Sequence, residues 1–110
     1  MGYPRKLNIC GKIYHVTYVK RHIDVDPDGE ELLWGQVDYR RRRIRVYDGK
    51  EYTSNPDKFD TLIHEMIHAI LREHSMLMSI VGEMEEPFVN DVASAITDCL
   101  IRNKLIEEWG

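Results

Sequence analysis

The sequence predicts an α+β fold: a small antiparallel or mixed sheet of three to four strands, followed by one long helix and a second helix packed on it. Two observations support this order. Up to residue 47, apolar and polar residues alternate in short runs, as on half-buried strands. From residue 55 onward, apolar residues recur every three to four positions, as on one face of a helix. A length of 110 residues suits a single domain, which we expect to span 1–110.

The first predicted element is a β-hairpin over Leu7 to Val19, with Cys10 and Gly11 as its turn. Its apolar positions alternate with polar ones: Tyr14, Val16 and Tyr18. His15 lies on the opposite phase, so we expect an exposed strand residue there rather than a metal ligand. The polar segment Arg21 to Glu31 is expected to form a turn.

Two further strands are predicted over Leu33 to Tyr39 and Arg43 to Tyr47, again from alternation. The run Arg40 to Arg43 lies at their junction and could hold phosphates or an acidic partner. However, the chain is acidic overall, and the run contains no interleaved aromatic residues on which bases could stack. We therefore predict a solvated turn, with Arg43 and Arg45 on the wet side of an edge strand.

The long helix is predicted from Asn55 to about His74. Asparagine at the cap, Pro56 at the first helical position and an acid, Asp57, in the first turn are signals of a helix start. Most of the circumference from residue 59 to 71 is apolar, so we expect this helix to be largely buried.

A methionine-rich connection is expected over Ser75 to Glu85, with its methionines filling the core. The second helix is predicted to start at Pro87, with Glu86 at its cap, and to end near residue 103 or 104. Its apolar residues follow the helical period: Phe88, Val89, Val92, Ala93, Ile96, Leu100 and Ile101.

The long helix carries the motif His64-Glu65-x-x-His68. Residues four apart lie on the same helix face, so both imidazoles can point at one ion, as a Zn²⁺ site requires. Glu65 lies about 100° further round the helix. It is badly placed as a ligand but well placed to take a proton from a metal-bound water.

A catalytic zinc site needs a third protein ligand, and the candidates are His74, Glu85 and Glu86. His74 follows His68 by six residues, but Leu71 between them does not break the helix, so the His74 ring is expected to point away. Glu85 and Glu86 both lie where the second helix begins. Periodicity barely separates the two, and acids at a helix N-terminus are also common without any metal.

Composition limits the partners and the compartment. The net charge is −4, and no apolar run is long enough to span a membrane, so nucleic acid and membrane partners are not expected. The N-terminal residues lack the apolar core of a signal peptide. The two cysteines, Cys10 and Cys99, have neither metal-type nor redox-type spacing and are expected to be reduced and buried, as in a cytoplasmic protein.

The segment Thr61 to Ile70 and the later pattern Glu86-x-x-Val89-Asn90-x-Val92-Ala93 resemble small gluzincin-type metallopeptidases, specifically the ImmA/IrrE-like and SprT-like domains of phages and prophages. The resemblance implies a minimal zincin-like fold with Zn²⁺ held by His64, His68 and Glu86, and Asn90 as a supporting group behind the ligands. The SprT-like pattern has a later histidine, and none follows His74 here.

The expected function is therefore a zinc metallopeptidase, phage or prophage encoded, acting on a protein or peptide substrate with Glu65 as the catalytic base. The alternatives are a non-catalytic zinc-binding interaction module that keeps the fold and a structural zinc site closed by His74. The oxyanion donor is left open among three residues: Tyr47, Tyr52 and Arg72. The strand Arg43 to Tyr47 is a candidate for pairing with an extended substrate.

Overall fold

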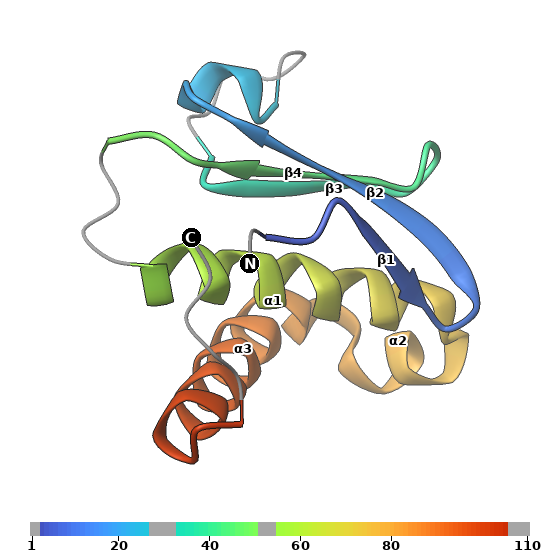
Figure 1. The fold of residues 1–110 in the computed structure, drawn as a ribbon. Coiled ribbons are helices and arrows are strands. Elements are labelled where there is room, and N and C mark those ends of the chain that lie inside the picture. Colours follow the sequence, from blue (N-terminus) through green and yellow to red (C-terminus); the bar gives the residue numbers. More distant parts are fainter. Residues whose placement is uncertain (1–2, 27–32, 51–54, 106–110) are drawn as a thin grey trace.

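The computed structural model describes residues 3–26, 33–50 and 55–105 and has the predicted α+β fold, a four-stranded mixed sheet followed by helices (Figure 1). Its elements are β1 (Lys6–Ile9), β2 (Lys12–Val19), η1 (His22–Asp24), β3 (Gly35–Asp38), β4 (Arg43–Tyr47), α1 (Asn55–Glu73), α2 (Ser75–Val81), η2 (Gly82–Met84) and α3 (Glu85–Arg102). In Figure 1 the sheet lies above α1, and α3 crosses below it. The helix α1 is therefore the middle layer.

The strands follow the order β1-β2-β4-β3. β1 and β2 pair antiparallel, β2 and β4 pair parallel, and β3 and β4 pair antiparallel. The prediction that Arg43 and Arg45 lie on an edge strand is therefore wrong, because β4 lies between two other strands. Its inward residues Ile44 and Val46 are fully buried in the cluster that joins the sheet to α1. Among the described strands, β1 and β3 form the two edges of the sheet.

The predicted hairpin between β1 and β2 is confirmed. Cys10 and Gly11 both have positive φ angles, 54° and 85°, as the two central residues of a type I′ turn must have. Tyr14 and Val16 point into the core, and His15 is exposed as predicted.

Two of the predicted turns fall largely within the described residues. The junction Arg40 to Arg43 is a turn, with Arg42 at a φ of 50° and its Nε 3.7 Å from Glu73 Oε1. Of the predicted turn Arg21 to Glu31, the first part contains η1, and positions 27–31 lie outside the described residues.

Two apolar clusters hold α1 between its neighbours. The first joins α1 to the sheet and contains Ile9, Tyr14, Val16, Ile44, Val46, Leu62 and Ala69. The second joins α1 to α3 and contains Ile67, Leu71, Val89 and Ala93. Tyr14 also donates its hydroxyl hydrogen to Glu73 Oε1 at 2.9 Å, which ties the sheet to the end of α1. Both faces of α1 are thus covered, and only a narrow stripe of it remains polar.

The segment expected to be a connection, Ser75 to Glu85, is helical. It has no glycine or proline before Gly82, and methionine and leucine are good helix formers, which explains the short helix α2. Among its methionines only Met78 packs against the α1–α3 core, whereas Met76 and Met84 are exposed.

The helix α3 starts at Glu85, two residues before the predicted start at Pro87. Proline is accepted in a first helical turn because the backbone N–H groups there have no partner within the helix. The end at Arg102, next to the C-cap Asn103, agrees with the prediction. None of the described helices is long and apolar enough to cross a membrane.

Both cysteines are free, as predicted, but both are exposed, so the prediction of burial is wrong. Cys10 lies at the tip of the β1–β2 hairpin. Cys99 lies on α3, where the buried residues form only a narrow stripe: Val89, Ala93 and Thr97. That stripe is narrower than the apolar period of the sequence indicates, which leaves Cys99 outside it.

The packing predicts a large cost for Leu62→Ala. Leu62 is fully buried between α1 and the sheet, so truncation should lower the free energy of unfolding by about 2–5 kcal/mol, measured by urea denaturation. The control is Ile80→Ala on α2, where the side chain is 75 % exposed and the expected change is within about 0.5 kcal/mol. Equal losses in the two variants would contradict the layered arrangement.

Candidate metal centre

The polar stripe of α1 lies under the edge strand β3 and beside the first turn of α3. Glu65 and His68 are only 7 % and 8 % exposed, and His64 is partly buried. α3 reaches the stripe because Val89 and Ala93 are buried against α1. The two histidines therefore lie in a polar slot between apolar packing surfaces.

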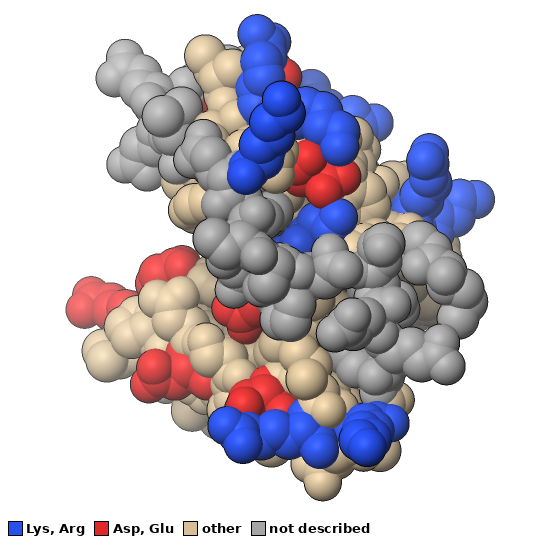
Figure 2. Space-filling model, turned by 60° about the vertical axis from the view of Figure 1, so that its left-hand side comes forward, with Lys and Arg blue, Asp and Glu red and all other residues tan. Residues whose placement is uncertain are grey.

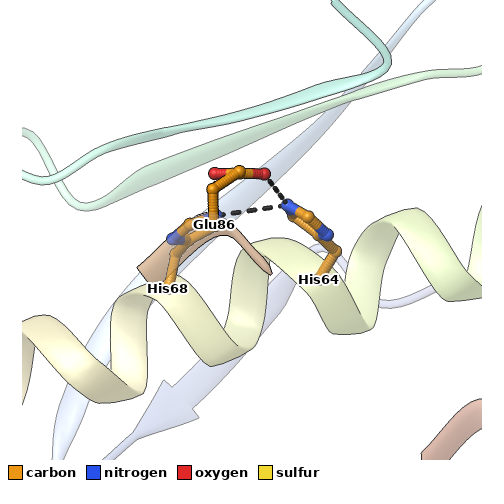
Figure 3. Close-up of side chains that lie close together, drawn as sticks. All are labelled: His64, His68 and Glu86. Atoms are coloured by element: carbon orange, nitrogen blue, oxygen red, sulfur yellow. Dashed lines mark hydrogen bonds and ion pairs between the residues drawn. The ribbon is translucent and has the colours of Figure 1, made fainter. Parts of the chain in front are cut away.

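His64, His68 and Glu86 come together at one point. The Nε2 atoms of the two rings lie 3.1 Å apart, and Glu86 places Oε1 2.9 Å from His64 Nε2 and Oε2 3.1 Å from His68 Nε2. Figure 3 shows both imidazoles rising from α1 and the carboxylate of Glu86 lying across them. One donor atom from each of these residues thus lies within 4.8 Å of the others.

The donors suit a divalent ion such as Zn²⁺. Two imidazole nitrogens and a carboxylate oxygen form one of the donor sets of catalytic zinc sites, and tetrahedral coordination spaces such atoms about 3.3 Å apart. Burial, followed by the charge of His68, lowers the pKa of His64 and outweighs the opposite effect of Glu86. The His64 ring is therefore neutral at neutral pH, the form that binds metal.

Glu65 lies beside the three candidate ligands without joining them. Its Oε2 is 3.9 Å from His64 Nε2, beyond hydrogen-bonding distance. Burial, reinforced by the charge of Glu86, raises the pKa of Glu65 to about 8. A carboxyl group with such a pKa can take up and release a proton near neutral pH, as a general base must.

Gly35 of β3 allows the strand to approach the site closely. A Cβ atom at this position would lie 2.8 Å from Thr61 Cγ2 and 2.9 Å from Glu65 Cγ. Any larger residue would therefore displace the strand or Glu65. The alternation of residues along β3 carries no signal of this role, so sequence reasoning missed it.

A cleft of about 710 Å³ opens over the site. Its walls are Leu33, Gly35, Gln36, Val37 and Tyr39 on the sheet side, His64, Glu65 and His68 on α1, and Gly82, Glu83, Glu85 and Glu86 at the start of α3. The side chain of Glu86 is 64 % exposed, against 19 % for His64 and 11 % for His68. Solvent therefore reaches the three donors from the Glu86 side.

Charge is unevenly distributed over the surface of the protein. On the face in Figure 2, most Lys and Arg side chains lie over the sheet half, and most Asp and Glu side chains lie over the helical half. Three acids line the α3 side of the cleft: Glu83, Glu85 and Glu86. A cation is thus favoured where the two imidazoles meet.

The two other candidate ligands are placed elsewhere. Glu85 Oε2 lies 2.5 Å from Nδ1 of His68, on the side of the ring turned away from the three converging donors. His74 occupies the N-cap position of α2 without a side-chain capping bond, and its Nε2 lies 3.0 Å from Cys10 Sγ. Of the three candidates, only Glu86 reaches Nε2 of both histidines, and its role as a ligand stays a prediction.

Of the supporting and oxyanion candidates that the structure describes, Asn90 and Tyr47 lie outside the site. Asn90, which the resemblance places behind the ligands, is exposed on α3. Tyr47 is buried with its ring stacked 3.7 Å from that of His22, and it lines a separate hollow with Lys20, Asp48, Gly49 and Lys50. Tyr52 lies outside the described residues.

Of the described oxyanion candidates, Arg72 lies near the cleft. It packs against Tyr39, a cleft residue that the sequence did not identify as a candidate. Its guanidinium lies 4.3 Å from the ring centre of Tyr39, which lines the cleft directly after β3. Burial, then the charge of Glu85, raises the pKa of Tyr39, so its hydroxyl keeps its proton and can donate. Tyr39 shares the strand phase of Gly35 and Val37, a signal that could have found it.

No family model, no curated protein and no solved structure matches this chain. The resemblance to gluzincin-type domains therefore stays a prediction. The geometry of the residues themselves is what supports a function.

The metal-free protein is predicted to lose stability as pH rises, because of Glu65. The pKa of Glu65 is about 8 in the folded protein, against an ordinary value of 4.5 for a glutamate, so between these values the folded state holds a proton that the unfolded state has released. The free energy of unfolding therefore falls through this window. Glu65→Gln should remove the effect and be more stable than the parent by a few kcal/mol at about pH 8.

Urea unfolding in the presence of a chelator, at about pH 5 and about pH 8, measures the difference. The two proteins should converge toward the acidic end of the range. Parallel pH dependence of both would show that Glu65 is ionised in the folded metal-free protein.

Proposed function

We propose that this chain is a zinc-dependent metallopeptidase that hydrolyses peptide bonds. One observation carries the proposal: His64, His68 and Glu86 converge within hydrogen-bonding distance, while the buried carboxyl group of Glu65 lies beside them in an open cleft. A site that only stabilised the fold would need neither the cleft nor a second carboxyl group, that of Glu65, kept out of the ligand set.

Each residue then has a distinct task. A divalent ion held by His64, His68 and Glu86 would polarise the substrate carbonyl and make a water molecule acidic enough to lose a proton near neutral pH. Glu65 takes that proton and returns it to the leaving amine. Tyr39 lines the cleft with Arg72 beside its ring. Its hydroxyl group is the proposed hydrogen-bond donor to the carbonyl oxygen, on which negative charge develops during the reaction.

The substrate is proposed to lie along β3, not along β4 as the sequence alone suggested. Both edges of β4 are paired, so it cannot accept another strand. Tyr47 N–H donates to Trp34 C=O, and alternation along this antiparallel pair leaves the N–H and C=O groups of Gly35 and Val37 at the free edge. An extended peptide added there would run directly over the cleft.

A non-catalytic zinc-dependent interaction module is the second candidate. It is favoured by apolar side chains that α2, η2 and the start of α3 leave exposed: Met76, Leu77, Ile80, Met84 and Phe88. Exposed apolar patches of this kind mark binding surfaces in many proteins. A structural zinc site closed by His74 is not proposed, because His74 contacts Cys10. Phage or prophage origin and a cytoplasmic location stay predictions.

Glu65→Gln is predicted to separate metal binding from hydrolysis. The variant should bind one Zn²⁺ per chain like the parent, because Glu65 is not one of the candidate ligands and its Oε2 lies 3.9 Å from His64 Nε2. Its cleavage of a peptide library, read by mass spectrometry, should fall at least about 100-fold, because the general base is gone.

Asp91→Asn, an exposed acid on α3, is the control and should behave like the parent in both assays. Full hydrolysis by Glu65→Gln would remove Glu65 from the mechanism. Stoichiometric zinc in the parent with no cleavage of any library member would favour the interaction module instead.

A further inference from the structure

The two ring nitrogens of His68 have different partners. Nε2 faces His64 Nε2 and Glu86 Oε2 at 3.1 Å each, whereas Nδ1 faces Glu85 Oε2 at 2.5 Å. The side chain of His68 is only 11 % exposed, so both contacts are largely shielded from water. The ring is thus held from both ends by consecutive residues of α3.

The partner of Nδ1 requires that this nitrogen of His68 carry a hydrogen. A carboxylate can only accept a hydrogen bond, so the short contact with Glu85 requires a hydrogen on Nδ1. A neutral imidazole has one N–H, and its other nitrogen carries a lone pair. A hydrogen on Nδ1 leaves Nε2, which faces His64 and Glu86, as the nitrogen that can bind an ion through its lone pair, in exchange for any hydrogen that Glu86 Oε2 accepts from it.

We propose that Glu85 is a positioning residue, which fixes the tautomer and the ring orientation of His68 for metal binding. The inference rests on the proposed metal site of His64, His68 and Glu86. A carboxylate behind a metal-binding imidazole holds the ring in place and makes its free nitrogen a better donor. Glu85 thus acts on the ion through His68 and does not touch it.

The first turn of α3 explains why Glu85 supports His68 while Glu86 is the candidate ligand. Glu85 and Glu86 are adjacent, so their side chains leave the helix about 100° apart, and one reaches Nδ1 while the other reaches Nε2. Val89 and Ala93, buried against α1, hold this turn in place. The side chain of Glu85 is 22 % exposed and that of Glu86 is 64 % exposed, as expected for an inner and an outer member of the pair.

The resemblance assigns this supporting role to Asn90, and the structure does not support that assignment. Asn90 is exposed on α3, and its side chain forms no hydrogen bond with His64 or His68. In this chain the support for His68 comes from the residue directly before the third candidate ligand, not from the one four positions after it.

The test compares Glu85→Ala and Glu85→Gln with two controls. Glu83→Ala removes an exposed acid from the same cleft, and Asn90→Ala removes the alternative support. The Zn²⁺ affinity of each protein is measured by competition with a chelating dye. The tautomer of His68 is read in the metal-free proteins from long-range ¹H–¹⁵N NMR correlations of its ring.

Glu85→Ala should weaken Zn²⁺ binding by about 10- to 100-fold and shift the hydrogen of the metal-free His68 ring from Nδ1 toward Nε2, where Glu86 is the remaining acceptor. Glu85→Gln keeps an oxygen that can accept from Nδ1, so it should keep the tautomer and lose less affinity than Glu85→Ala. Both controls should bind Zn²⁺ like the parent, within about threefold, since each side chain is exposed. The conservative variant also serves if Glu85→Ala fails to fold.

Three outcomes would overturn the proposal. The first is an unchanged His68 tautomer in Glu85→Ala. The second is an equal loss of affinity in Glu83→Ala, which would mean that only the negative charge of the cleft matters. The third is intact Zn²⁺ binding in Glu86→Ala with none in Glu85→Ala, which would make Glu85 the ligand.

Failure of the proposed function would give different results from failure of the proposed role of Glu85. A parent protein that binds no Zn²⁺ would remove the metal site, yet the tautomer of His68 in the metal-free protein would still decide whether Glu85 holds the ring. Absent peptidase activity would leave both measurements on Glu85 unaffected.

Discussion

The arrangement depends on the burial of α1 from two opposite sides while one stripe of it stays polar. The sheet covers one side through Leu62 and Ala69, and α3 covers the other through Ile67 and Leu71. These two layers form the walls of the slot that holds the histidines. Because desolvating charged groups is costly, such a slot persists only if its polar groups satisfy one another or bind an ion. The candidate metal centre follows from this packing.

Helical spacing was enough to predict the centre of the site. His64, Glu65 and His68 could be assigned to one stripe of one helix, and that stripe lies in a partly buried slot. The choice between Glu85 and Glu86 could not be made from periodicity, because both acids lie in the first turn of α3. It required the crossing of α3 over α1, which brings one carboxylate to each side of the His68 ring.

The order of the strands in the sheet could not be predicted from the sequence either. Alternation located all four strands, but it does not state which strands pair, so the internal position of β4 and the edge position of β3 were missed. The close approach of Gly35, in that edge strand, to Thr61 and Glu65 depends on the pairing and could therefore not be predicted either. The short helix α2 could not be predicted because seven residues are too few to display a clear period.

The parallel pairing of β2 with β4 has a consequence for the order in which the protein folds. The β1–β2 and β3–β4 pairs are local hairpins, so closing them requires little chain entropy. Joining β2 to β4 brings His15 next to Arg43 and must close the whole intervening segment. Contacts this distant in sequence form slowly. We therefore expect two preformed hairpins that dock late, with Ile44 and Val46 uncovered until they do, so that the nascent chain is most prone to self-association just before its sheet is complete.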